Sequence, residues 1–261
     1  WDTPPFEPRI ADGVIYARGA SDDKGQVYTH LKALEAYIET GTDLPVNVKF
    51  IIEGEEESGG ESIYRYTEQN PEKLACDAVV VSDTTLYNET TPGICYSLKG
   101  MAYMEIRVSG PAMDLHSGSY GGVVRNPANA LAEIVAALKD KEGRCLIPGF
   151  YDDVLEWDAD TREAIRQLPH SDEEFRKSVG APGLSGEAGY STLERLWIRP
   201  TCEVNGLLSG YTGEGAKTVL PARAMAKVSF RLVPNQDPER VAELLATEGI
   251  DGVDTASGTA R

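Results

Sequence analysis

Acidic residues follow three strand-like segments in the first third of this 261-residue chain. Asp22 and Asp23 come after the first segment, the run Glu53-Gly54-Glu55-Glu56-Glu57-Ser58-Gly59 after the second, and Asp83 after the third. Carboxylates held a few ångströms apart repel one another, so that either the pKa of one of them rises or a cation compensates the charge. The pattern therefore predicts most of a metal site.

The residue types at these positions indicate which metal and which chemistry to expect. Asp22, Glu57 and Asp83 fall at the carboxyl ends of successive predicted strands, where open α/β proteins bind small molecules. Their hard oxygen ligands suit Zn²⁺, Mn²⁺ or Mg²⁺, and added imidazole ligands would favour Zn²⁺ or Mn²⁺. A two-metal hydrolytic site also needs a base to activate water. We assign this role to Glu56, because adjacent side chains such as those of Glu56 and Glu57 point in different directions.

Each acidic group has a simpler explanation when it is taken alone. Asp22 and Asp23 precede a predicted helix, and the dipole of a helix favours anions at its start. Acidic residues are also common in turns. The succession of three groups after three strands nevertheless favours the metal site.

The hydrophobic pattern of the first half predicts alternating strands and helices. Short apolar and β-branched runs predict strands at 13–17, 46–52 and 78–81, and the strand at 46–52 is expected to be buried. Apolar residues at helical spacing predict helices at 24–40 and 61–69. This order is typical of α/β proteins with a mostly parallel sheet that helices cover on both faces.

From residue 100 onward the pattern changes to that of an antiparallel sheet with one exposed face. Apolar and polar residues alternate at 102–108 and at 224–232, which predicts two half-buried strands. Residues 140–215 are expected to be rich in loops. Helices are expected to begin at capping residues, two of them followed by proline: Asn126-Pro127, Asp160, Ser171 and Asp237-Pro238. These elements predict a second domain of the α+β class.

The overall composition excludes several classes of protein. A net charge of −17 opposes binding to nucleic acid, whose phosphates repel an acidic surface, and disfavours anionic membranes. No apolar stretch of the sequence reaches the length of a transmembrane helix. The four cysteines form no Cys-x-x-Cys pair, which argues against a thiolate zinc site and favours a cytoplasmic protein.

Five motifs in chain order resemble those of one family, the zinc metallopeptidases of carnosinase/aminoacylase type. The segment Tyr16-Ala17-Arg18-Gly19-Ala20-Ser21-Asp22-Asp23-Lys24-Gly25 is similar to the Gly-Arg-Gly-x-x-Asp-Asp-Lys-Gly signature of that family. The Glu-rich run is similar to its second motif and Val81-Ser82-Asp83 to its third. Two further segments resemble the lid domain of that family. They are Asp114-Leu115-His116-Ser117-Gly118 and the region from Lys217-Thr218 to Phe230-Arg231-Leu232-Val233-Pro234. The dipeptidases are the most similar subgroup.

The resemblance implies an architecture and a set of partners. Residues 1–98 correspond to the N-terminal part of the catalytic domain, which is incomplete here, and residues 99–261 correspond to a lid and dimerisation domain. The implied cofactors are two Zn²⁺ ions, with Mn²⁺ as the alternative. The implied partners are a dipeptide or short peptide substrate and a second copy of the chain in a homodimer.

The resemblance also implies roles for the acidic residues. Asp22 bridges the two ions, Glu57 completes the ligands of one ion, and Asp83 completes those of the other. Glu56 takes a proton from the bridging water. The family holds the peptide bond between Asp22 and Asp23 in the cis form, which is rare away from proline.

Three residues of the second domain contact the substrate by the same resemblance. His116 polarises the scissile carbonyl across a dimer interface, Arg231 pairs with the C-terminal carboxylate of the substrate, and Thr218 contacts the substrate nearby. A planar guanidinium binds a carboxylate in bidentate fashion, which agrees with the role of Arg231. The simpler alternatives are a solvated strand face for Arg231 and a merely exposed loop histidine for His116. His30 lies within an amphipathic helix pattern and is assigned to packing.

Two histidine ligands that complete the site in this family have no counterpart in the chain. The first belongs to a His-x-Asp motif expected shortly before Trp1, and the second is expected beyond Arg261. We therefore expect the full-length protein to be a dinuclear zinc dipeptidase. The 261-residue chain by itself is expected to be inactive, because carboxylates alone leave the ligand set of zinc incomplete.

Two other functions are compatible with the sequence. An amidohydrolase that deacylates N-acyl amino acids would share all the motifs. A non-catalytic dimerisation or scaffold protein would explain the missing histidines, but such a protein has no use for Glu56 or for the pair Asp22 and Asp23.

Overall fold

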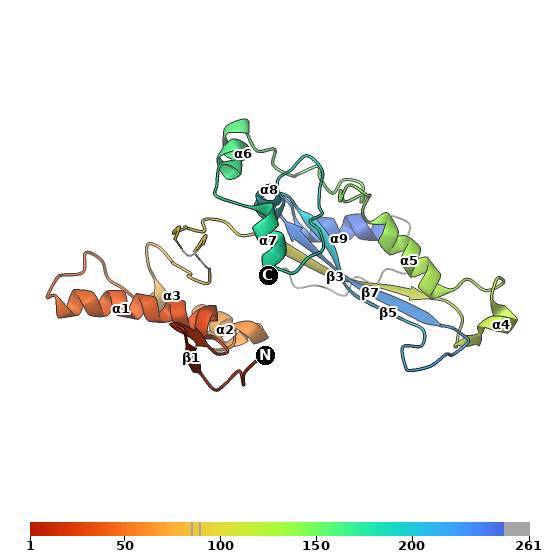
Figure 1. Ribbon diagram of the computed structural model, residues 1–261, viewed down its shortest axis with the longest axis horizontal. Helices are drawn as coiled ribbons and strands as arrows, with labels where there is room; N and C mark the ends of the chain where they lie inside the picture. Colours follow the sequence, from red (N-terminus) through yellow and green to blue (C-terminus); the bar gives the residue numbers. More distant parts are fainter. Residues whose placement is uncertain (85, 89, 248–261) are drawn as a thin grey trace. The chain divides into compact units, whose positions relative to one another are not determined.

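The structure is a computed structural model that describes residues 1–84, 86–88 and 90–247. The chain forms two compact units, unit 1 (Trp1–Cys95) and unit 2 (Tyr96–Arg261), coloured from red to yellow and from yellow to blue in Figure 1. The predicted division into a catalytic part, 1–98, and a lid, 99–261, stays a prediction. Within the described ranges, no helix has both the length and the apolar composition needed to cross a membrane.

The elements of unit 1 are short strands, turns and helices: β1 (Arg9–Ala11), β2 (Val14–Tyr16), the π-helical turn η1 (Ala20–Lys24), α1 (Gly25–Glu39), the 3₁₀ turn η2 (Glu56–Ser58), α2 (Glu61–Gln69) and α3 (Pro71–Leu74). β1 and β2 form an antiparallel hairpin whose turn residues, Asp12 and Gly13, both have positive φ angles, 52° and 78°. An Asp-Gly pair adopts this turn readily, since glycine has no Cβ to clash. The strand predicted at 13–17 and the helices predicted at 24–40 and 61–69 are confirmed.

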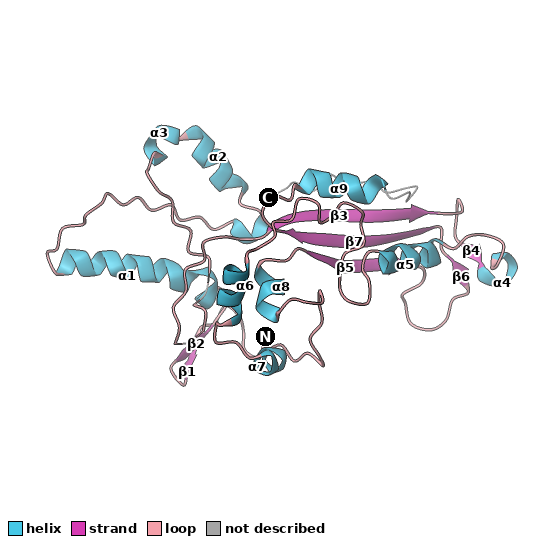
Figure 2. Ribbon diagram, turned by 90° about the horizontal axis from the view of Figure 1, so that it is seen from above, coloured by secondary structure: helices cyan, strands magenta, loops and turns pink. Residues whose placement is uncertain are grey.

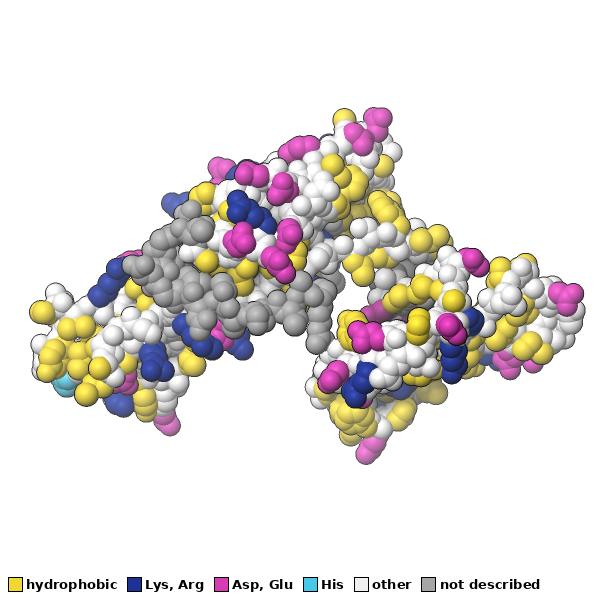
Figure 3. Space-filling model, turned by 180° about the vertical axis from the view of Figure 1, so that it is seen from behind, with side chains coloured by type: hydrophobic (Ala, Val, Ile, Leu, Met, Phe, Trp, Pro, Cys, Tyr) yellow, Lys and Arg dark blue, Asp and Glu magenta, His cyan; other side chains and the backbone are white. Residues whose placement is uncertain are grey.

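The strands predicted at 46–52 and 78–81 are wrong. Both segments lack regular structure, and the side chains of Val46, Ile52 and Val80 are 63%, 62% and 79% exposed. Hydrophobic side chains accordingly gather on the surface of unit 1, on the right of Figure 3. A parallel strand of this composition needs a paired neighbour and helices over both faces, and the described residues of unit 1 supply neither. The helix-covered parallel sheet is therefore not formed among them.

The elements of unit 2 surround an antiparallel sheet: β3 (Gly100–Ser109), β4 (Leu115–His116), α4 (Ser117–Tyr120), α5 (Pro127–Ala137), α6 (Ala159–Arg166), α7 (Asp172–Ser178), α8 (Thr192–Trp197), β5 (Thr201–Ser209), β6 (Val219–Leu220), β7 (Arg223–Leu232) and α9 (Pro238–Thr247). The sheet has the order β3-β7-β5, with β7 in the centre and antiparallel to both neighbours. β3 and β7 confirm the two predicted alternating strands.

One face of this sheet carries the core of unit 2. Met104 of β3, in register with Val228 of β7, is buried with Phe230, while α5 contributes Leu131 and α9 contributes Leu245. Figure 2 shows both helices running along the strands. Their predicted starts are confirmed: the side chain of Asn126 caps α5 and that of Asp237 accepts a bond in the first turn of α9. The apolar face of the alternating pattern is thus the covered face.

Two local predictions for residues 140–215 fail and one is confirmed. β5 is not expected from the sequence, because a bulge between Val204 and Gly206 interrupts its alternation of apolar and polar residues. α6 is capped by Asp158 rather than Asp160, since the Asp158 carboxylate accepts the Thr161 backbone N–H at 2.7 Å. Ser171 caps α7 as predicted.

Candidate functional site

Asp22 lies in the tight turn η1, which joins the β2 strand to the first helix. The peptide bond between Asp22 and Asp23 is cis, as the family resemblance implies. The turn begins after Gly19, whose φ of 77° favours glycine. The Asp22 side chain is exposed, whereas Asp23 is partly buried.

The acidic residues of the second motif divide into two pairs. Glu53 accepts the backbone N–H of Glu55, and the Glu55 carboxylate accepts that of Ser62 at 3.2 Å in the first turn of α2. The hydrogen bonds from Ser62 lower the pKa of Glu55. These two acids therefore support the local turn. Glu56 and Glu57 lie in η2 with exposed side chains.

An ion pair connects the second acidic motif with the first. The guanidinium of Arg18, in the segment that leads to Asp22, lies 3.4 Å from the Glu57 carboxylate. Both side chains are about half exposed, so the pair contributes little to stability. The pair nevertheless shows that the turn of Glu57 lies next to the segment that leads to Asp22.

Two hydrogen bonds connect the third acidic motif with α1, the helix that follows Asp22. His30 Nε2 lies 2.6 Å from Ser82 Oγ, and Gln26 Nε2 donates to the carbonyl of Thr84 at 3.2 Å. Asp83 lies between these two anchored residues and is exposed. The assignment of His30 to packing is therefore wrong: its ring is exposed and bonds to the segment of Asp83.

The carboxylates of these three motifs are suitable ligands for a metal ion, but they are not arranged as one site among the described residues. Carboxylate oxygens are suitable ligands for Zn²⁺ and Mn²⁺. In the part of the chain that the structure describes, however, no group of three or more His, Cys, Asp or Glu side chains is arranged to hold an ion. Asp23 Oδ1 is buried and has no hydrogen-bond partner there. The segments that carry Asp22, Glu57 and Asp83 are thus linked by side-chain contacts, while the three carboxylates form no ligand cluster among the described residues.

His116 lies in a short ladder that joins two distant parts of unit 2. β4 pairs with β6, so that His116 is opposite Val219 and beside Thr218. Thr218 Oγ1 lies 3.2 Å from His116 Nε2, and the other ring nitrogen, Nδ1, accepts the backbone N–H of Gly118 at 3.0 Å. The structure thus brings together two of the three predicted substrate-contacting residues.

These bonds assign the proton on the neutral imidazole ring. Since Nδ1 accepts the Gly118 N–H, the proton must reside on Nε2, which becomes the donor on the exposed side of the loop. Gly118 makes the arrangement possible, because a Cβ atom there would lie 2.7 Å from His116 Cε1 and 3.0 Å from Nδ1. The sequence signal for this requirement is the Gly/Ser loop itself.

Arg231 does not join this pair within one subunit. It lies near the end of β7, opposite Met101 on one side and Thr201 on the other, and its side chain is exposed. Thr218 precedes the start of the same strand. The eight-residue interval from Arg223 to Arg231 spans about 27 Å at the rise of an antiparallel strand.

Lys99 is a charged residue near Arg231 that belongs to none of the sequence motifs. It is half-buried, and its Nζ donates to the carbonyl of Arg195 at 2.8 Å. Burial, together with the positive charges of Arg231 and Arg199, lowers the pKa of Lys99 to about 8. In the sequence, Lys99 is marked only by its position directly before an alternating strand, and a lysine at such a position does not indicate a functional site.

Comparison with known proteins identifies relatives along nearly the whole chain. Residues 1–246 match the profile of peptidase family M20/M25/M40. A Cys-Gly metallodipeptidase from Schizosaccharomyces pombe is 36% identical over 248 residues, which cover 94% of this chain and 52% of the relative. A human Beta-Ala-His dipeptidase is 34% identical over 247 residues, covering 92% of this chain and 48% of the relative. The chain spans about half the length of the curated relatives it matches.

A solved structure gives the same result for the fold. An M20 family metallo-carboxypeptidase from Sulfolobus solfataricus superposes with a TM-score of 0.81 at 43% identity, over 94% of this chain and 56% of that one. The predicted α/β class and the predicted resemblance to metallopeptidases with dipeptidase members are confirmed. The motifs around Asp22, Glu57 and Asp83 lie within the matched residues. The chain belongs to peptidase family M20/M25/M40.

Proposed function

We propose that the whole protein hydrolyses the peptide bond of dipeptides or short peptides with the help of two metal ions, Zn²⁺ or Mn²⁺. The observation that carries the proposal is that side-chain contacts link the segments of Glu57 and Asp83 to the parts of the chain before and after Asp22. Arg18 ties the Glu57 turn to the segment of Asp22, and His30 ties the segment of Asp83 to α1. The names of two relatives, a Cys-Gly metallodipeptidase and a Beta-Ala-His dipeptidase, support the substrate class.

Each acidic residue has one task in this proposal. Asp22, Glu57 and Asp83 are the carboxylates that would hold the ions, which supply Lewis acidity and lower the pKa of water. Glu56 is the general base that takes a proton from the attacking water. Its exposed side chain has no hydrogen bond or ion pair with the described residues, which leaves both of its oxygens available to accept that proton.

The substrate is held by residues of unit 2. His116 Nε2–H donates to the oxygen of the scissile carbonyl, and Thr218, its neighbour, contacts the same part of the substrate. A donor aimed at a developing oxyanion is worth about 10² to 10³ in kcat. Arg231 binds the C-terminal carboxylate, which its planar guanidinium can accept with two hydrogen bonds.

These assignments require two copies of the chain. A dipeptide spans about 7 Å when extended, whereas about 27 Å of strand separate the two ends of β7 at which Thr218 and Arg231 lie. One substrate therefore cannot contact both residues of one subunit. We infer a homodimer formed through unit 2, in which His116 and Thr218 act across the interface on the substrate that Arg231 of the other copy holds.

An assay of substrates tests the proposal and separates it from its alternatives. The full-length protein is incubated with Zn²⁺ or Mn²⁺ and offered Cys-Gly, β-Ala-His and the matching N-acetyl amino acids. We expect the dipeptides to be hydrolysed, and we expect a chelator to abolish this hydrolysis. Preference for the acetyl amino acids would instead identify a deacylase, and no turnover of either class would favour the scaffold function. The 261-residue chain is expected to remain inactive, because its described residues gather no set of three metal ligands.

A further inference from the structure

A pair of cations, Lys99 and Arg231, lies at one end of the sheet of unit 2. Met101 is directly opposite Arg231 in the ladder between β3 and β7, and Gly100 is opposite Leu232. Lys99 lies directly before β3, two positions from Met101, and its ammonium is close enough to Arg231 for the two positive charges to interact. Such diagonal neighbours lie about 7 to 8 Å apart at the backbone, within reach of two long side chains.

Thr201 completes the surroundings of Arg231 on the other side. It is directly opposite Arg231 in the ladder between β5 and β7 and is partly buried. Its hydroxyl is therefore on the same face as Arg231. This end of the sheet presents two positive charges and a hydroxyl donor over a short distance, although the protein as a whole carries a net charge of −17.

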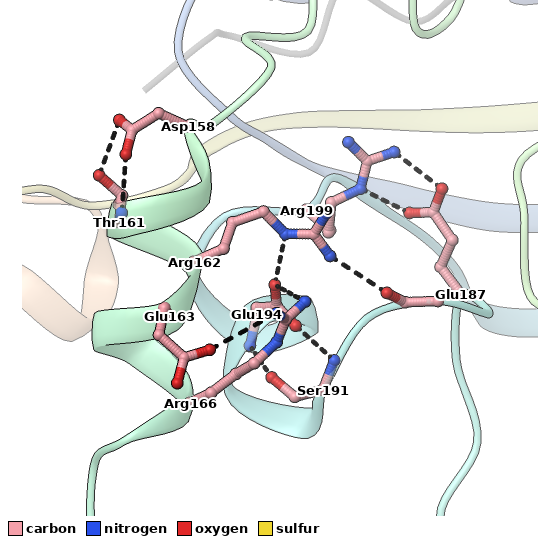
Figure 4. A network of polar contacts seen from close by, with 10 residues as sticks. Asp158, Thr161, Arg162, Glu163, Arg166, Glu187, Ser191, Glu194 and Arg199 are labelled. Atoms are coloured by element: carbon pink, nitrogen blue, oxygen red, sulfur yellow. Dashed lines mark hydrogen bonds and ion pairs between the residues drawn. The ribbon is translucent and has the colours of Figure 1, made fainter.

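Three acidic residues of this region are bound to other cations. Glu203, two positions from Thr201 on β5, accepts a hydrogen bond from Lys139 at 3.0 Å. Glu187 receives two hydrogen bonds from Arg199, both of 2.7 Å, and Glu194 receives bonds of 2.6 and 3.2 Å from Arg162 and Arg166 (Figure 4). Glu187 and Glu194 are buried, 7% and 0% exposed, so neither can turn toward the sheet face.

Lys99 and Arg231 have no acidic partner among the described residues. The Lys99 ammonium donates a hydrogen bond to the carbonyl of Arg195, an uncharged acceptor in α8. Burial and the charges of Arg231 and Arg199 lower its pKa to about 8, which shows that the site does not compensate its charge. A half-buried ammonium beside an exposed guanidinium is stabilised by an anion placed between them.

We propose that Lys99 and Arg231 together form one carboxylate-binding site, with Lys99 as a second substrate-binding residue that takes the C-terminal carboxylate of the peptide. The choice of a peptide as ligand rests on the proposed function. The geometry suits a carboxylate, because Arg231 supplies a planar fork and Lys99 a point charge from the diagonal position. The carbonyl of Arg195 holds the ammonium in place before the ligand arrives.

Competitive labelling of lysines tests this site without requiring turnover. The full-length protein is treated with trace acetic anhydride at about pH 7.5, and the acetylation of Lys99 is measured by mass spectrometry relative to exposed Lys141. A bound carboxylate stabilises the ammonium form and lowers the reactivity of the amine. With glycylglycine at about four times its Kd, labelling of Lys99 is expected to fall about fivefold relative to Lys141.

The controls assign the protection to the carboxylate and to the site. Glycylglycinamide, which lacks the carboxylate, is expected to give no protection, and Arg231→Met is expected to remove the protection by glycylglycine. Equal protection by the amide and the acid, or none by either, would overturn the proposal. Protection that persists unchanged in Arg231→Met would overturn the pairing of the two residues.

Kinetics provide an independent readout that separates this inference from the proposed function. Lys99→Met is expected to raise KM for a dipeptide about tenfold with little change in kcat, and Lys99→Arg is expected to restore most of the affinity. A dipeptide amide should be affected by neither variant. Protection without hydrolysis would refute the peptidase function alone, and hydrolysis without protection would refute the Lys99 site alone.

Discussion

His116 Nε2 and Thr218 Oγ1 lie 3.2 Å apart, although 102 positions separate the two residues in the chain. The ladder between β4 and β6 brings them together, and the backbone N–H of Ser117 donates to the carbonyl of Thr218 at 3.1 Å. Because the backbone N–H of Gly118 donates to Nδ1 of the His116 ring, Nε2–H is the ring donor that remains, on the exposed side of the loop. A substrate carbonyl can therefore replace Thr218 as the acceptor without a change of tautomer.

Substituting Gly118 tests whether this ring orientation matters. In Gly118→Ala the new Cβ would lie 2.7 Å from His116 Cε1, so the ring must move and lose its bond to the loop. We expect kcat of the full-length enzyme to fall about 10²-fold, the typical effect of a lost oxyanion donor. Thermal unfolding should hardly change, since the loop is exposed.

Gly183→Ala is the matched control for this substitution. A Cβ at Gly183 would meet no atom within 4 Å, so both kcat and the melting temperature should stay at the wild-type values. Full activity of Gly118→Ala at an unchanged melting temperature would contradict the role assigned to the His116 ring.

Mixing two inactive variants tests whether His116 acts across a dimer interface. Glu56→Gln and His116→Asn are each expected to be inactive, but a mixed dimer would contain one site with an intact base and an intact histidine. Random exchange of subunits should therefore restore about a quarter of the wild-type activity. The measurement is the rate of dipeptide hydrolysis after the two proteins are unfolded together and refolded.

The control for the mixing experiment combines Glu56→Gln with Arg231→Met. Both residues serve the same site of one subunit in the proposed dimer, so no mixed dimer has an intact site and activity should stay at background. Recovery in this second mixture, or its absence in the first, would show that the assignment of residues to subunits is incorrect.

Glu194 is expected to be a main determinant of the stability of unit 2. Its side chain is 0% exposed and accepts hydrogen bonds from Arg162 and from Arg166. Glu194→Gln leaves these guanidinium groups without a counter-charge, which typically costs about 3 to 5 kcal/mol of unfolding free energy. Chemical denaturation measures this loss. Glu163→Gln, which removes an exposed partner of Arg166 at 3.9 Å, should cost less than about 0.5 kcal/mol.

The same carboxylate makes stability depend on pH in a defined window. Burial alone would raise the pKa of Glu194, but hydrogen bonds from the Ser191 backbone and from Arg162 outweigh it and lower the pKa to about 2. A lowered pKa stabilises the fold above the unfolded value near 4.5, and this contribution of about 3 kcal/mol disappears as pH falls toward 2.

Comparing two proteins isolates this contribution from that of other carboxylates. The difference in unfolding free energy between wild type and Glu194→Gln should be constant above about pH 5 and shrink steadily below it. A difference that stays the same down to about pH 2 would show that Glu194 does not titrate with a lowered pKa.

The two long strands β3 and β7 of unit 2 and the helices α1 and α2 of unit 1 could be predicted from the sequence, whereas the state of segments 46–52 and 78–81 could not. The alternation in β3 and β7 is a local property of each strand, as are the caps Asn126 and Ser171. Segment 46–52 has the composition of a buried strand, but such a strand exists only where other segments pair with it and cover it. β5 could not be predicted for a local reason, because the bulge between Val204 and Gly206 interrupts its alternation of apolar and polar residues.

The candidate site shows a similar division. The family resemblance pointed to His116 and Thr218, and the structure joins them. The contact of His30 with Ser82 depends on how the chain folds back and has no signal in the helical pattern. Lys99 is equally inconspicuous, since its closeness to Arg231 follows from the pairing of β7 with β3, the strand that begins one residue later.

Whether Glu56 is the base of a metal-dependent dipeptidase can be measured through kcat of Glu56→Gln in the full-length protein. Metal content is measured on the same samples, and Glu61→Gln, an exposed glutamate of α2, serves as the control. We expect kcat of Glu56→Gln for a dipeptide to fall by a factor of about 10² to 10⁴, with its metal content unchanged and with Glu61→Gln fully active. A Glu56→Gln protein that binds metal and keeps the wild-type kcat would show that Glu56 is not the base.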